Sequence, residues 1–399
     1  MKKTRRILIA GAGIGGLTAA LSLLRRGYDV QVCEQAAELR EVGAGLQLSP
    51  NGLRALYQLG LGDALAALAS EPEGKEIRLW STGQTWKLFD LGKTSVADYG
   101  YPYFMIYRPD LHKVLIDAVR AIKADAILLG AQCDGFRQDD EGVTLTLADG
   151  RELQGDMLVG ADGVHSRIRA QLFGADKPSF SGCLAWRGVI PMERLPQHMR
   201  RAVGTNCVGP GAHVIHYPLH GGKLMNFVGI VERSDWLVES WTEKGTHAEC
   251  HADFDGWHAD VHELISHVDV PYKWALMARP PLARWSEGKV TLVGDACHPT
   301  LPFLAQGAVM AIEDGYLLGR CIAQYDADAP LALARYEQAR IERTTKIVLR
   351  STENGKRFHN PALASPEGAA AYVDREWAED KVRDRYDWLF RYNVDKVAL

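Results

Sequence analysis

The segment from Arg6 to Leu24 constrains the fold more than any other part of this 399-residue sequence. It begins with the apolar run ILIA, which has the length of a buried parallel strand, and it ends with leucines and alanines at helical spacing. Between them lies the stretch GAGIGG, which contains the pattern GxGxxG at Gly11, Gly13 and Gly16. A strand, a glycine-rich turn and a helix in this order predict a site that binds the pyrophosphate of a dinucleotide at the helix N-terminus.

Each glycine of the pattern has its own expected role. Gly11 allows the tight turn, Gly13 lets the backbone approach the pyrophosphate, and Gly16 lets the helix pack closely on the strand. Basic residues precede the uncharged stretch 7–24, so a secretion signal is the alternative. Each glycine in this stretch would destabilise a continuous signal-peptide helix by about 1 kcal/mol. Cleavage of a signal would also remove the first strand of the expected dinucleotide-binding unit. The dinucleotide site is therefore the favoured interpretation.

A second strand is expected over residues 29–33, and an acid follows it. Glu34 stands about 20 residues after Gly11, where a carboxylate accepts a hydrogen bond from a ribose hydroxyl. An acid at this place favours an unphosphorylated ribose. The nucleotide is therefore expected to be FAD or NAD.

Two later strands lead into polar motifs. Residues 157–160 run into Asp162 and Gly163, and residues 290–293 run into Gly294 and Asp295. Ligands of open α/β sheets bind at the carboxyl ends of strands, so Asp295 can hold a second ribose or a ribityl chain. A helix expected to begin near Gly307 can stabilise negative charge on a reduced flavin ring.

In this order the three motifs resemble those of the single-component FAD-dependent aromatic hydroxylases, the group A flavoprotein monooxygenases. The resemblance implies an α/β fold of the p-hydroxybenzoate hydroxylase type. A Rossmann-like FAD-binding domain is then expected at 1–75, 103–180 and 276–345. An inserted, mainly antiparallel β-sheet domain for the substrate is expected at 76–102 and 181–275, and a C-terminal helical segment at 346–399.

The resemblance also implies contacts with FAD. Asp295 is expected on the ribityl side, and the segment of Asp162 and Gly163 is expected to serve both FAD and the nicotinamide. Further expected FAD contacts are Arg40, Gly45 and Arg108. A salt bridge with Asp110 at a helix N-terminus is the alternative for Arg108. The sequence has one dinucleotide fingerprint, so NADH or NADPH is expected as a transient reductant.

Candidate substrate residues lie on the strand expected around residues 213–217. His213 and Tyr217 share one of its faces, which either lines a pocket or faces solvent. Resemblance to 3-hydroxybenzoate 6-hydroxylases, in which a His and a Tyr line the ring pocket, favours the pocket. Gln47 also resembles that type. Pro302 is more similar to salicylate and 6-hydroxynicotinate hydroxylases, which have a His where this chain has Phe303.

The implied reaction is the hydroxylation of a phenolic aromatic acid with O2, through a flavin C4a-hydroperoxide that attacks a phenolate. The best candidate is 3-hydroxybenzoate to 2,5-dihydroxybenzoate; salicylate 1-hydroxylase and 6-hydroxynicotinate 3-monooxygenase are alternatives. His213 is expected to take the phenol proton and Tyr217 to orient the ring. His298 is an alternative base. A flavin dehydrogenase and a non-catalytic FAD scaffold are alternatives of another class.

Charge and cysteine content indicate which binding partners and which cellular compartment to expect. The net charge of −4 gives no reason to expect nucleic acid or a membrane surface as a partner. The seven cysteines show no CxxC and no metal-like spacing, which favours reduced thiols in the cytoplasm and no metal site. The aromatic C-terminal segment could cap the FAD domain or form a dimer surface, so a monomer or a homodimer is expected.

Overall fold

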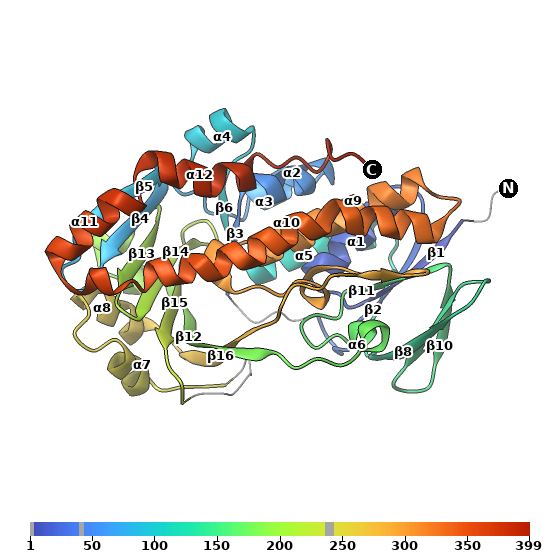
Figure 1. The fold of residues 1–399 in the computed structure, drawn as a ribbon, viewed down its shortest axis with the longest axis horizontal. Helices are drawn as coiled ribbons and strands as arrows, with labels where there is room; N and C mark the ends of the chain where they lie inside the picture. The colour runs from blue at the N-terminus through green and yellow to red at the C-terminus, as the bar shows by residue number, and fades with distance from the viewer. Residues whose placement is uncertain (1–3, 40–43, 236–242) are drawn as a thin grey trace.

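The computed structural model describes residues 4–39, 44–235 and 243–399. Two different sheets lie at opposite ends of the molecule, and the long helix α10 (Ala329–Phe358) extends along both of them (Figure 1). This arrangement confirms the α/β class expected from the sequence. In the described part of the chain, none of the helices has the length and apolar character that crossing a bilayer requires.

The first sheet contains the glycine-rich turn. Its strands are β1 (Arg6–Ala10), β2 (Asp29–Cys33), β7 (Ile127–Leu128), β11 (Met157–Gly160), β17 (Ser286–Glu287) and β18 (Val290–Leu292). They lie in the order β17-β18-β11-β1-β2-β7, and all neighbours run parallel except β17 and β18. Strand β1 is apolar because its neighbours and the covering helices bury it. An antiparallel meander lies beside this sheet, formed by β8 (Cys133–Gln138), β9 (Val143–Leu147) and β10 (Glu152–Gly155).

The second sheet is mainly antiparallel. Its strands are β4 (Gly74–Leu79), β5 (Thr85–Asp90), β12 (Ser179–Pro191), β13 (Val203–Gly209), β14 (Ala212–Leu219), β15 (Leu224–Glu232) and β16 (Tyr272–Ala278). They lie in the order β16-β12-β15-β14-β13-β4-β5, with β4 and β13 parallel. Strand β14 confirms the strand expected around residues 213–217, and it forms a hairpin with β15. A separate pair, β3 (Gly45–Leu48) and β6 (Phe104–Tyr107), is antiparallel.

Helices fill the space around the first sheet. They are α1 (Ile14–Leu24), α2 (Pro50–Gln58), α3 (Gly62–Ala66), α5 (Arg108–Ile122), α6 (Arg167–Phe173) and α9 (Gly307–Gln324). Helix α9 crosses α1 at close range because it presents glycines there. A Cβ added to Gly315 would lie 2.6 Å from the backbone N of Ala19, and one added to Gly319 would lie 2.2 Å from Oγ of Ser22.

Buried ion pairs join α9 to α10. The guanidinium of Arg340 contacts Glu313 and Asp314, each at 2.7 Å, and all three side chains are fully buried. Arg343 adds a second pair with Glu313 at 2.8 Å. Removing one partner from such a cluster would leave an uncompensated buried charge, which typically costs about 3–5 kcal/mol.

The remaining helices lie around the second sheet. They are α4 (Lys93–Tyr99), α7 (His247–Asp253), α8 (Ala259–His267), α11 (Pro366–Glu376) and α12 (Glu379–Phe390). In α12 the ring of Tyr386 lies 5.4 Å from that of Phe89 on β5, and Phe390 lies 5.4 Å from Tyr99. The C-terminal segment therefore caps its own chain. The boundary expected at 346 lies inside α10.

Candidate active site

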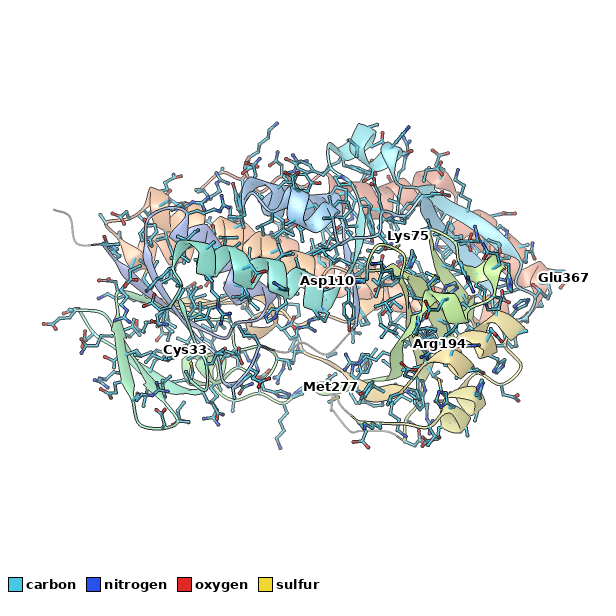
Figure 2. The ribbon with its side chains drawn as sticks, turned by 180° about the vertical axis from the view of Figure 1, so that it is seen from behind. Cys33, Lys75, Asp110, Arg194, Met277 and Glu367 are labelled. Carbon is cyan, nitrogen blue, oxygen red and sulfur yellow. The ribbon has the colours of Figure 1, made fainter. Side chains whose placement is uncertain are left out.

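A cavity of about 430 Å³ lies where the two halves of the molecule meet. The nucleotide-binding half contributes Gly13, Gly45, Arg108, Gly163, Asp295 and Gly307 to its wall. The second sheet contributes Lys75, Ile77, His213, Ile215, Tyr217 and Val228. Figure 2 shows Lys75 and Asp110 near this boundary, with Cys33 in one half and Arg194 in the other. Most of the residues singled out from the sequence thus face one cavity.

The glycine-rich turn has the geometry that a pyrophosphate requires. Gly11 has a φ of +105°, and a Cβ there would lie 2.3 Å from the carbonyl oxygen of Ala161. A Cβ on Gly16 would lie 2.1 Å from the carbonyl oxygen of Gly11, so this glycine permits close packing. Gly13 has no atom within 4 Å of its Cβ position and faces the cavity. These three environments match the separate roles expected for the three glycines.

Two helix N-termini open toward the cavity. Gly13 precedes α1 and Gln306 precedes α9, and neither makes a side-chain cap hydrogen bond. The first N–H groups of a helix have no acceptor inside the helix, so they attract anions. Beside the turn, the Glu34 carboxylate accepts from the N–H of Ala12 at 2.8 Å and of Ala36 at 2.9 Å. It retains lone pairs for a ribose hydroxyl.

The other nucleotide-side residues are placed as follows. Asp295 lines the cavity on the 3-10 turn η3 (Gly294–Ala296), and burial raises the pKa of its carboxyl. Asp162 caps α6, where it accepts from Oγ of Ser166 at 2.5 Å and from the N–H of Arg167 at 2.8 Å. Gly163 faces the cavity instead, with no atom within 4 Å of its Cβ position. Arg40 lies outside the described residues.

Arg108 begins α5 and lines the cavity. The alternative for it was a salt bridge with Asp110. In the structure the Asp110 carboxylate is 2.7 Å from Nδ1 of His220. Arg108 also contributes to the electrostatic environment of Asp295, whose pKa it lowers. FAD fits these surroundings: open backbone at Gly13 and Gly163 can receive it, uncapped N–H groups suit its phosphates, and Asp295 can accept from its hydroxyls.

On the second sheet, His213 and Tyr217 face the cavity from one side of β14. Tyr217 follows His213 by four positions along the strand, so their Cα atoms are about 13 Å apart. His213 is fully buried between the rings of Phe303 at 5.6 Å and Phe358 at 5.1 Å. Burial holds its pKa well below the ordinary value, so the imidazole is neutral at pH 7. Its Nδ1 lies 2.6 Å from Nε2 of His359.

A second polar group surrounds Tyr217. Nζ of Lys75 donates to the hydroxyl of Tyr103 at 2.8 Å, and that hydroxyl donates to Oε1 of Gln47 at 2.7 Å. Burial raises the pKa of Tyr217, although a hydrogen bond with Gln47 partly opposes this, and its hydroxyl stays protonated. The ammonium of Lys75 loses hydration in the cavity, which lowers its pKa to about 7. Lys75 pairs in register with Gly204, where an added Cβ would lie 2.6 Å from Cε of Met105.

Sequence reasoning missed Lys75 and His359. The boundary expected after residue 75 left Lys75 in the FAD-binding domain, whereas it lies on β4 of the second sheet, where alternation places Lys75 and Ile77 on one face. No local signal points to His359, because it follows α10 and is 146 residues from His213. Pro302 and Phe303 both line the cavity, on the 3-10 turn η4 (Pro302–Leu304).

His298, the alternative base, is buried and pairs with Asp314. Its Nε2 lies 2.5 Å from Oδ2 of Asp314, and both side chains are buried. Together with Cys297 these residues form the group of three possible metal ligands found in the described part of the chain. The Asp314 carboxylate already binds Arg340 and the N–H of Gly294, so the ion-pair network accounts for this cluster.

Comparisons with known proteins agree with this geometry. A family model described as "FAD binding domain" matches residues 4–351. The 3-amino-4-hydroxybenzoate 2-monooxygenase PtnB3 of Streptomyces platensis is 38% identical, over 98% of this chain and 97% of that protein. The 3-hydroxybenzoate 6-hydroxylase of Polaromonas naphthalenivorans is 34% identical, over 97% and 96%. The crystal structure of Klebsiella pneumoniae HpxO with FAD and uric acid has a TM-score of 0.84 at 25% identity, covering 98% of this chain and 97% of that one.

Proposed function

Since this chain belongs to the family of single-component FAD-dependent aromatic monooxygenases, we propose that it hydroxylates a phenolic aromatic acid. The reaction that fits best is 3-hydroxybenzoate to 2,5-dihydroxybenzoate, with NADH or NADPH as the reductant. One observation carries the proposal. A single cavity joins the nucleotide-binding turn of α1 to a buried, neutral histidine on the second sheet.

FAD would be held by backbone and by a few side chains of the nucleotide half. The N-termini of α1 and α9 suit its phosphates and its ring, Glu34 suits a ribose, and Asp295 suits the ribityl chain. Bound FAD supplies hydride acceptance and, with O2, an electrophilic oxygen atom. The protein must then supply position, exclusion of water and control of one proton.

We propose that His213 accepts the phenol proton of the substrate. A phenol is a weak nucleophile and a phenolate a strong one, so a base must take the phenol proton while the ring lies in the cavity. Nε2 of His213 has no hydrogen-bond partner among the described residues, whereas Nδ1 faces His359. A neutral imidazole with a free nitrogen at the cavity wall suits a general base. Tyr217, whose hydroxyl stays protonated, would orient the ring from the other end of the cavity.

Lys75 is our candidate for the substrate carboxylate. It is a cationic side chain at the end of the cavity opposite His213, on the same sheet. A carboxylate beside Nζ would favour the charged form and so raise the pKa of the amine again. A ring whose carboxylate lies beside Nζ would then occupy the cavity that His213 also lines.

Two finer statements complete the proposal. We place the protein in the cytoplasm, because all seven cysteines are buried free thiols, as a reducing compartment favours. We propose a monomer or a homodimer, since α12 covers its own chain rather than offering its aromatic residues to a partner.

A substrate screen tests the proposal. The FAD-loaded protein is mixed with NADH or NADPH and with 3-hydroxybenzoate, salicylate, 6-hydroxynicotinate or 3-amino-4-hydroxybenzoate, the last because of the relative from Streptomyces. Oxidation of the reductant, hydrogen peroxide and hydroxylated product are all measured. We expect one phenolic acid to stimulate oxidation and to gain an oxygen atom from labelled O2. Oxidation without incorporated oxygen would favour the flavin dehydrogenase, and no stimulated oxidation would favour the scaffold.

A further inference from the structure

A chain of hydrogen-bonding groups leads from the cavity to the surface. Nδ1 of His213 lies 2.6 Å from Nε2 of His359, and Nδ1 of His359 lies 2.9 Å from Oε1 of Glu232. The side chains of both histidines are buried, but that of Glu232 is 57% exposed. The three residues come from β14, from the end of α10 and from the end of β15, so the fold assembles the chain from distant segments.

We propose that His213, His359 and Glu232 form a proton relay, which carries the proton of the phenolic substrate from the cavity to solvent. The relay rests on the proposed function, because it begins where His213 accepts the phenol proton. It adds two residues to the site, neither of which lines the cavity wall. His359 and Glu232 act through His213 and are therefore positioning and transfer residues.

The hydrogen-bond partners determine where the protons lie. An ionised carboxylate can only accept, so Nδ1–H of His359 donates to Glu232. Burial lowers the pKa of His359, and the neutral ring must then accept at Nε2. Nδ1–H of His213 therefore donates to His359. The free nitrogen of His213 is Nε2, which is the atom without a protein partner in the described residues.

The surroundings explain why such a path is needed. A protonated His213 would be a charge among the rings of Phe303 and Phe358, where desolvation makes it costly. Among the three groups of this chain, Glu232 is the one that is exposed to solvent. The neighbouring cation, Arg233, is already paired with Asp235 at 2.6 Å and with Asp253 at 2.8 Å. The thiol of Cys183 also lies near Glu232, which helps to raise the pKa of that thiol.

The transfer is balanced by a shift of one proton at each group. Nε2 of His213 takes the phenol proton, and its Nδ1 proton moves to Nε2 of His359. The Nδ1 proton of His359 moves to the Glu232 carboxylate, which releases it to water. When the hydroxylated ring recovers its aromatic form and its oxygen takes a proton back, the reverse shift restores both rings.

The test follows the proton without turnover. The FAD-loaded protein is mixed rapidly with 3-hydroxybenzoate, in the absence of reductant. The phenolate ultraviolet band reports ionisation, and a pH-indicator dye in weak buffer reports release to solvent. We expect the wild-type protein to show both signals with the same rate.

Glu232→Gln is the decisive variant. The amide oxygen still accepts a hydrogen bond from His359, but the amide does not take up the proton. We expect both signals to slow at least tenfold in this variant, with ligand affinity changed less than twofold, and Glu232→Asp to restore most of the rate. His359→Gln should slow the signals at least as much. His262→Asn is the matched control, because His262 also forms a histidine pair, 2.8 Å from His251, on the surface helices α7 and α8; it should leave both signals unchanged.

The possible failures are distinguishable. If His213→Gln abolishes the phenolate signal and Glu232→Gln leaves its rate unchanged, the relay is wrong and the proposed base stands. If the wild-type protein binds 3-hydroxybenzoate without forming phenolate, both the base and the relay are wrong for this ligand class. FAD content and melting temperature are measured for every variant, and a slow His359→Gln that has lost FAD counts against the relay unless Glu232→Gln is also slow.

Discussion

Burial lowers the pKa values of two side chains that line the cavity, His213 and Lys75. For His213 this produces a neutral base among aromatic rings. For Lys75 it produces an amine with a pKa of about 7, which a bound anion can recharge. Under the proposed function, loss of hydration would favour proton acceptance by His213 and anion binding by Lys75.

Replacing His213 should separate catalysis from cofactor binding. We expect His213→Gln to reduce the rate of product formation roughly 100-fold or more, the usual contribution of a general base. The affinity for FAD should stay within about twofold, because the histidine lies on the second sheet, away from the glycine-rich turn. Stopped-flow product analysis and fluorescence titration of FAD measure the two quantities. Unchanged turnover would remove His213 from the role of base.

Lys75 should make substrate affinity dependent on pH. Below pH 7 its ammonium is charged and attracts the carboxylate; above pH 7 the free protein must first take up a proton, so the Kd for 3-hydroxybenzoate should rise with pH. Lys75→Met should raise the Kd roughly 10- to 100-fold, the value of one charged hydrogen bond, and should flatten its dependence on pH. Lys87→Met is the control, because Lys87 pairs with Asp90 on the exposed surface. Equal slopes in Lys75→Met and wild type would contradict the assignment.

Sequence reasoning reached some of these residues and not others. His213 and Tyr217 could be predicted to share a face, because a strand alternates and because the resemblance supplied their role. The pairing of His213 with His359 could not be predicted, since it depends on where α10 ends relative to β14. The role of Asp162 also needed the structure: its carboxylate caps α6, whereas the neighbouring Gly163 faces the cavity.

At the scale of elements, the contact between α1 and α9 sets the position of both helix N-termini at the cavity. The expected strand, turn and helix at the N-terminus were correct, and so was the helix starting at Gly307. Their mutual distance was not predictable, because it depends on which face of α9 carries glycine. The structure identifies that face, because Gly315 lies against Ala19 and Gly319 lies against Ser22.

Gly319→Ala should therefore destabilise the protein, although alanine normally favours a helix by about 1 kcal/mol over glycine. The added Cβ would lie 2.2 Å from Oγ of Ser22, so the helices must move apart. We expect the free energy of unfolding in urea to fall by about 1–3 kcal/mol, as for an overpacked core. Ser22→Ala in the same chain removes the nearest atom and should recover part of the loss. Increased stability of Gly319→Ala would show that the contact is not limiting.

At the scale of the whole molecule, one ligand site draws on both halves. The cavity wall combines the ends of α1 and α9 with the face of β14 and with Tyr386 of α12. The long helix α10 extends along both sheets, and ion pairs through Arg340 fix it to α9. The sequence suggested the alternation of the two halves along the chain, but it did not show that α10 extends along both, because the domain boundary expected at 346 lies inside this helix.

Removal of FAD should consequently weaken both halves. A ligand present at 100 times its Kd stabilises the folded state by about 2.7 kcal/mol, so we expect the apoprotein of this 399-residue chain to melt roughly 3 °C lower. Hydrogen exchange should become faster at the start of α1 and also along β14, which lies in the other sheet. The measurements are calorimetry and exchange mass spectrometry on the holoprotein and apoprotein. Faster exchange confined to the nucleotide half would mean that the second sheet is independent of the cofactor.

The order of strands in the first sheet has a consequence for biosynthesis. Strand β1 pairs with β11, and β11 pairs with β18, which ends at Leu292. A ribosome has thus translated about three quarters of the message before that sheet can be completed, and it must reach Tyr386 before the last wall of the cavity exists. A chain that ends between Leu292 and Tyr386 would contain all strands of the first sheet but would lack part of the cavity wall. Water would then enter the cavity.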